Sequence, residues 1–182
     1  MSNDTIMNAT QLLNQILTKA NICPSHGIEH AEKVYEQLVE AIRCDKDIPE
    51  SQIINVLLAG LLHDADDHKF FPGNKNYENA RSVLGQLKND EIDVEGVVQM
   101  ISWVSASVWK NEIPPAVLES GEFWRLLPRS ADRLEGVGEM AIPRALQYTK
   151  TIGRPLFIRG VSPELTTREE VIREASAERY KA

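Results

Sequence analysis

The chain has 182 residues, of which 42 % are hydrophobic and 26 % are charged, a balance typical of one soluble globular domain. Its 27 acidic and 20 basic side chains give a net charge of −7. This excess of acid disfavours binding to a nucleic-acid polymer, because such binding depends on clustered lysine and arginine, but a few local cations can still hold a small phosphorylated ligand.

Three features predict a cytoplasmic protein that does not enter a membrane. The first ten residues, MSNDTIMNAT, are polar and lack the apolar segment of a secretory signal. No apolar run reaches the ~18 residues that are needed to cross a bilayer. The two cysteines, Cys23 and Cys44, are too few for a disulfide framework, so we expect both to be reduced thiols.

Helical periodicity dominates the sequence, since the alternating β-branched runs that mark strands are scarce. In the first predicted helix, for example, Leu13, Ile16 and Leu17 recur on one face. Apolar positions left exposed on that helix would support a homodimer. We expect one all-α domain, a helical bundle over residues 1–182, with helices at about 9–20, 25–44, 50–64, 76–88, 91–106, 122–137, 138–151 and, in the charged tail, 163–182.

The predicted helix 50–64 has an unusual end. Pro49 stands at its start, where the missing N–H is harmless, and the following residues are apolar on most sides, which indicates a central buried helix. Its last stretch, LLAGLLHDADDHK (residues 57–69), changes abruptly from apolar residues to His63, Asp64 and further acids. Ionisable groups at the edge of a core must find partners or ions.

The next predicted ligand lies on the second helix, where His26 and His30 are four residues apart and so share one face. His63 and Asp64 are adjacent in sequence. Adjacent helical residues point in different directions, so His63 and Asp64 can reach a single point only near a helix terminus or a local distortion.

A third acid, Asp132, stands beside Ala131 and Leu134, both of which we expect to face the core. A carboxylate among apolar neighbours requires a cation. The alternative to a metal ion is an ion pair with Arg129 or Arg133 on the same predicted helix.

Together, His30, His63, Asp64 and Asp132 offer two imidazoles and two carboxylates. This mixed nitrogen and oxygen set suits one divalent ion among Mn²⁺, Fe²⁺, Co²⁺, Ni²⁺, Zn²⁺ and Mg²⁺ and does not distinguish them. A bound divalent ion lowers the pKa of a water molecule and polarises a phosphoryl group. The predicted cofactor is therefore one such ion.

Three segments in order resemble the motifs of the HD superfamily of metal-dependent phosphohydrolases: SHGIEHAEKV, LLHDADDHKF and ADRLEGVG. The resemblance covers about residues 23–155, including GRPLF, which is similar to a segment of small single-domain members. It implies a helical bundle around one metal site, with His30, His63, Asp64 and Asp132 as ligands. It also implies hydrolysis of a nucleotide or a similar small phosphorylated substrate.

The resemblance implies further roles for three residues. In related alarmone hydrolases, an acid three positions after the ligand aspartate helps to place the attacking water, and here that position is Asp67. Lys69 would stabilise charge on a phosphoryl oxygen. His26 would donate to a phosphate or protonate a leaving group.

Two other functions use the same residues. A di-iron oxygenase needs more ligands than these four, and the chain has only four histidines in all. A sensor that binds metal and nucleotide without turnover would keep the same four ligands. Metal stoichiometry separates the first alternative from a hydrolase, and product formation separates the second.

Overall fold

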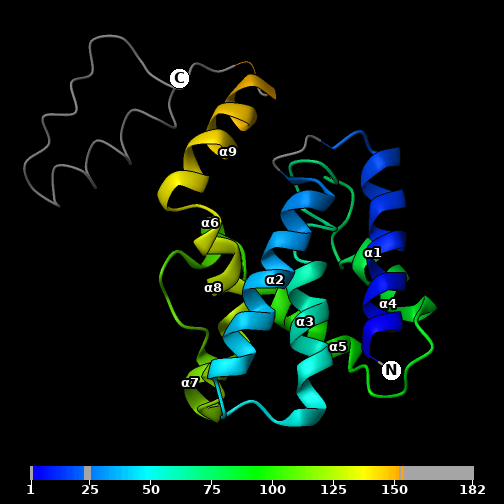
Figure 1. Cartoon of the computed structure of the whole chain (residues 1–182), viewed down its shortest axis with the longest axis vertical. Helices are drawn as coiled ribbons and strands as arrows, with labels where there is room; N and C mark the ends of the chain where they lie inside the picture. Colours follow the sequence, from blue (N-terminus) through cyan, green and yellow to red (C-terminus); the bar gives the residue numbers. More distant parts are fainter. Residues whose placement is uncertain (1, 23–25, 152, 154–182) are drawn as a thin grey trace, which may run out of the picture.

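The computed structural model describes residues 2–22, 26–151 and 153, and every regular element in this part of the chain is helical (Figure 1). The all-α prediction is confirmed for these residues. The predicted helix at 163–182 and most of the GRPLF segment lie outside them. The elements are α1 (Ser2–Lys19), α2 (Ile28–Cys44), η2 (Glu50–Gln52), α3 (Ile53–Leu61), α4 (Glu78–Gln86), α5 (Val94–Ser102), α6 (Ala106–Trp109), α7 (Pro115–Ser120), η3 (Phe123–Leu126), α8 (Leu127–Leu134) and α9 (Gly138–Thr151).

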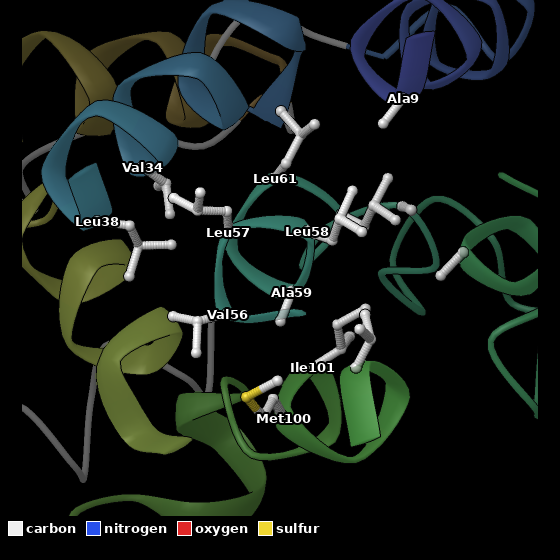
Figure 2. Packing of buried hydrophobic residues seen from close by; sticks show 14 of the residues in the cluster. Ala9, Val34, Leu38, Val56, Leu57, Leu58, Ala59, Leu61, Met100 and Ile101 are labelled. Carbon is white, nitrogen blue, oxygen red and sulfur yellow. The ribbon is translucent and has the colours of Figure 1, made fainter. Parts of the chain in front are cut away.

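Helix α3 is the centre of the fold, as its apolar composition predicts. Eight of its nine residues, from Ile54 to Leu61, are buried. Figure 2 shows why: Leu57 points toward Val34 of α2, while Ala59 points toward α5. Helices α1, α2, α5 and α8 all pack against α3. Burial on every side explains the nearly unbroken apolar run, because no face of this helix meets water.

Helices α2 and α3 run side by side in opposite directions (Figure 1). Gly60 allows their close approach, since a Cβ atom at this position would overlap the side chain of Leu38. This contact lies three residues before His63. The antiparallel arrangement brings the start of α2 and the end of α3 to the same end of the bundle.

Several predicted helix limits are wrong, and proline and capping residues explain two of the differences. The predicted helix 122–137 is divided into η3 and α8, and Pro128 occupies the first turn of α8, where its missing N–H breaks no helical bond. The predicted helix 91–106 begins only at Val94, because the carboxylate of Asp93 caps it by accepting from the Gly96 N–H. Helix α1 begins earlier than predicted, at Ser2.

The end of the central helix also differs from the prediction. Helix α3 ends at Leu61, so His63 and Asp64 lie in the turn that follows it. Two adjacent side chains can reach a single point near a helix terminus, and His63 and Asp64 occupy such a position. Within the described residues, no helix is both long and apolar enough to cross a membrane.

One buried polar residue ties α3 to the start of α5. Asn55 is 1 % exposed, and its amide Nδ2 donates to the Glu91 carbonyl at 3.3 Å. Its Oδ1 accepts from the Asp93 N–H at 2.9 Å. Asn55 thereby fixes the residue that caps α5.

We predict that Asn55→Ala lowers the free energy of unfolding by about 2 kcal/mol, because it removes the two hydrogen bonds that join this buried amide to the backbone of Glu91 and Asp93. Urea denaturation measures the change. Asn8→Ala is the matched control, since Asn8 is exposed on α1. Equal stability of the two variants would contradict this role for Asn55.

Candidate metal centre

Three separate elements carry the four predicted ligand residues to one place. His30 lies in the first turn of α2, His63 and Asp64 lie in the turn after α3, and Asp132 lies on α8. Because α2 and α3 are antiparallel neighbours (Figure 1), the start of α2 and the turn after α3 lie at the same end of the bundle, where His30 and His63 meet. Helix α8 packs against both α2 and α3 and adds the second carboxylate.

The distances define a compact cluster. The Nε2 atoms of His30 and His63 are 3.1 Å apart, and Asp64 Oδ2 lies 3.4 Å from His63 Nε2 and 3.8 Å from His30 Nε2. One ligand atom from each of these three residues lies within 4.8 Å of the others, so the group can hold a metal ion. Asp132 Oδ1 lies 3.3 Å from His30 Nε2 and 3.6 Å from His63 Nε2.

The neighbours of the two imidazoles indicate which nitrogen atoms offer lone pairs. His63 Nδ1 lies 2.7 Å from the Gly60 carbonyl, which only accepts, so this nitrogen carries the proton. Arg144 Nη2 lies 2.8 Å from His30 Nε2, and because arginine only donates, His30 Nε2 accepts. Both Nε2 atoms face the carboxylates. The Gly60 carbonyl holds the orientation of the His63 ring, whereas His30 Nδ1 is buried without a hydrogen-bond partner among the described residues.

Buried polar atoms in this cluster also fit a cation. Asp64 Oδ2 is buried and makes no hydrogen bond within the described residues, although His63 Nε2 lies 3.4 Å away. Such an oxygen is costly in a protein interior unless a positive charge faces it. Together with the imidazole nitrogens, this donor set matches the preference of first-row divalent ions for mixed nitrogen and oxygen ligands.

The pKa shifts show how strongly the cluster attracts positive charge. Burial would lower the pKa of His63, but the charge of Asp64 and the interactions with both carboxylates raise it well above its ordinary value. Burial would raise the pKa of Asp64, but protonated His63 lowers it to about 2. The pKa of Asp132 is likewise far below its usual range, because its contacts with His30 and His63 outweigh its burial. For His30, burial lowers the pKa, so this ring is neutral.

These protonation states balance the charges of the cluster. Asp64 and Asp132 contribute two negative charges, and protonated His63 and Arg144 contribute two positive charges. A divalent cation carries the same charge as that proton and guanidinium together. The cluster is therefore suited in both geometry and charge to hold one such ion.

Asp132 does not pair with the arginines of its own helix. Arg129 donates to the backbone carbonyls of Glu112 and Lys110, at 2.7 Å each, and Arg133 donates to Asn111 Oδ1. The ion-pair alternative for Asp132 is therefore wrong as stated. The prediction that Leu134 faces the core is also wrong, since this residue is 53 % exposed, whereas Ala131 is buried as expected.

His26 lies beside the cluster. Its ring is 6.4 Å from that of His30 and 5.2 Å from that of Phe70, measured between centroids. Burial lowers the pKa of His26, and the charges of Arg144 and Lys69 lower it further, against the opposing effect of Asp64 and Asp67. His26 is therefore a neutral ring near both the acids and the cations of the site.

Asp67 and Lys69 form a pair in the loop after the cluster. The carboxylate of Asp67 accepts from the Lys69 N–H at 2.9 Å and lies 3.5 Å from the Lys69 ammonium. It also lies 3.4 Å from His68 Nδ1. The first contact is the local turn that aspartate commonly forms two residues ahead. The charges of Asp67 and Lys69 both influence the pKa of His26, so the pair lies in the neighbourhood of that ring.

The sequence analysis missed two residues that the structure connects to this site. Arg144 reaches the cluster from α9, and no local pattern in the segment MAIPRALQY indicates this contact. Asp66 accepts from the backbone N–H groups of Asn79 and Ala80, at 2.9 and 2.8 Å, and so caps the start of α4. A cap from so far away in sequence leaves no spacing signal.

Comparisons with known proteins give a relative but no activity. No protein-family model matches the chain. The chain is similar to uncharacterized protein L803 of Acanthamoeba polyphaga mimivirus, with 29 % identity over 188 residues, covering 96 % of this chain and 74 % of the viral protein.

We predict that His63→Ala and Asp64→Ala each weaken Mn²⁺ binding by more than about 100-fold, because losing a ligand costs more than the 10–100-fold typical of changes around ligands. Isothermal titration calorimetry measures the affinity. Asp67→Asn is the matched control, since its carboxylate is engaged in its own loop, and it should bind Mn²⁺ almost as the wild type does. Retained binding in both alanine variants would contradict this site.

We predict that Asp66→Ala lowers the free energy of unfolding by about 1–2 kcal/mol, the usual range for loss of a helix cap. Thermal or urea denaturation provides the measurement. Asp90→Ala, which changes an exposed aspartate, should have little effect. If Asp66→Ala were as stable as Asp90→Ala, the capping contacts would not contribute to stability.

Proposed function

We propose that the chain is a metal-dependent phosphohydrolase of the HD type. Its substrate would be a nucleotide or a similar small phosphorylated metabolite, in which it would cleave a phosphate ester or anhydride. The observation that carries this proposal is the meeting of His30, His63, Asp64 and Asp132 at one end of the bundle. These residues come from three motifs that are far apart in sequence, in the order that the HD resemblance implies.

The four residues of the cluster would hold one divalent ion. When bound, that ion supplies an acidified water molecule and withdraws electrons from a phosphoryl group. The low pKa of both carboxylates keeps them ionised at neutral pH, as ligands must be. The Gly60 carbonyl fixes the His63 ring through Nδ1, which leaves Nε2 for the ligand role.

The remaining residues would act on the substrate and the water. The pKa of His26 responds to the charges of both Asp64 and Lys69, so His26 lies near both, and Lys69 and His26 each have a donor for a phosphoryl oxygen. Asp67 accepts a hydrogen bond from its own loop and keeps carboxylate lone pairs with which to orient a water molecule. These roles follow the HD resemblance, residue by residue.

The test begins with elemental analysis of the purified protein. One divalent ion per chain is expected, whereas two irons per chain would favour the oxygenase alternative. A panel of nucleotides and phosphomonoesters is then assayed with Mn²⁺. Thermal stabilisation by a nucleotide without any product would favour the sensor alternative.

We predict that His63→Ala and Asp64→Ala abolish Mn²⁺-dependent hydrolysis, with a loss of more than about 10³-fold, because no other described side chain replaces either ligand. Cys44→Ser is the control, since Cys44 is exposed at the end of α2. Lys69→Ala should lower the rate by about 10²-fold, as expected for loss of one charge-stabilising donor. Unchanged activity in both ligand variants would refute the proposed function.

A further inference from the structure

Arg144 is the residue of the cluster that neither motif nor spacing indicates. Its Nη2 lies 2.8 Å from His30 Nε2 and 3.5 Å from Asp132 Oδ1. The side chain of Arg144 is 22 % exposed, as is that of Asp132. The guanidinium of Arg144 thus lies against the same nitrogen of His30, Nε2, that points toward the other candidate ligands.

One nitrogen lone pair cannot serve two cations. His30 Nε2 has a single lone pair in the ring plane, and Arg144 Nη2 approaches it at 2.8 Å, closer than His63 Nε2 at 3.1 Å. A metal ion ligated by the same atom would require that lone pair and would repel the guanidinium charge. Arg144 and a metal ion held by His30 are therefore alternatives and cannot make these contacts together.

Helix α9, which carries Arg144, is able to change its position relative to the core. None of its described side chains is fully buried, and the apolar Ile142 and Leu146 are exposed by 63 % and 39 %. In Figure 1, α9 extends beyond the end of the bundle. Moving Arg144 away from His30 consequently disturbs no part of the hydrophobic core.

We infer that metal binding displaces Arg144 from His30 and Asp132, and that the displaced guanidinium becomes an anion-binding residue of the site. The identity of the anion, a phosphoryl group, rests on the proposed function. Guanidinium binds phosphate through two parallel N–H donors. Arg144 contacts His30, whose ring centroid lies 6.4 Å from that of His26, and the charges of Arg144 and Lys69 both lower the pKa of His26.

The direct test is nitrogen NMR of the arginine side chains in the full chain, with Zn²⁺ as a diamagnetic metal. Without metal, the Arg144 guanidinium should give a distinct signal, assigned with Arg144→Lys, because its contacts slow its rotation. Saturating Zn²⁺ should shift or broaden that signal, and inorganic phosphate should then shift it again. An Arg144 signal that stays unchanged while Zn²⁺ saturates the site would overturn the inference.

Binding measurements on Arg144→Ala provide the second test. Mn²⁺ should bind about tenfold more tightly to this variant, the factor expected if the guanidinium occupies the ligand face nine-tenths of the time. Inorganic phosphate should bind the Mn²⁺-loaded variant at least about tenfold more weakly than the wild type. Lys150→Ala, which removes a charge from an exposed position on the same helix, is the matched control.

Arg144→Ala and Lys150→Ala with the same affinities for Mn²⁺ and phosphate would overturn the inference. Neither test measures turnover, so the outcome of each test is independent of the activity assay for the proposed function. Hydrolysis by a protein whose Arg144 does not respond to Zn²⁺ would overturn the inference alone. Release of Arg144 by Zn²⁺ in a protein that hydrolyses no phosphate compound would refute the proposed function and leave the inference standing.

Discussion

Two carboxylates at the edge of an apolar core must be neutralised, and the arrangement around them follows from this requirement. Asp64 and Asp132 both face the imidazoles of His30 and His63, whose Nε2 atoms are 3.1 Å apart. Without a metal ion, the guanidinium of Arg144 and the imidazole of His63, whose pKa is raised by the two carboxylates, supply the positive charge. A divalent ion would supply the same charge through a single atom, which explains why a metal site and a pair of cations can share this position.

The close contact of α2 and α3 makes this cluster possible. Gly60 has no side chain, so Leu38 packs directly against the α3 backbone, and His30 of α2 meets His63 of the turn after α3 farther along. Helix α3 ends at Leu61, which releases His63 and Asp64 from helical geometry. Both residues can then face one point, which adjacent residues inside a helix could not do.

In the loop after Asp64, hydrogen bonds give the adjacent acids Asp66 and Asp67 different roles. Asp66 turns toward the backbone N–H groups at the start of α4 and holds the loop against that helix. Asp67 turns toward the backbone N–H and the ammonium of Lys69. Asp64 thus belongs to the candidate ligand set, Asp66 caps a helix, and Asp67 forms a local turn. Because these contacts stabilise the loop, they also keep Asp67 and Lys69 near His26.

The sequence by itself determined the helical character, the central position of the helix predicted at 50–64 and the four ionisable residues of the candidate site, because apolar periodicity and burial of charge leave local patterns. It misplaced several helix ends, since caps such as Asp93 and breaks such as the one before α8 depend on details that periodicity does not resolve. Only the tertiary structure brought Arg144 to His30 and Asp66 to α4. Those contacts join residues far apart in sequence, so the packing of helices decides them and no local spacing records them.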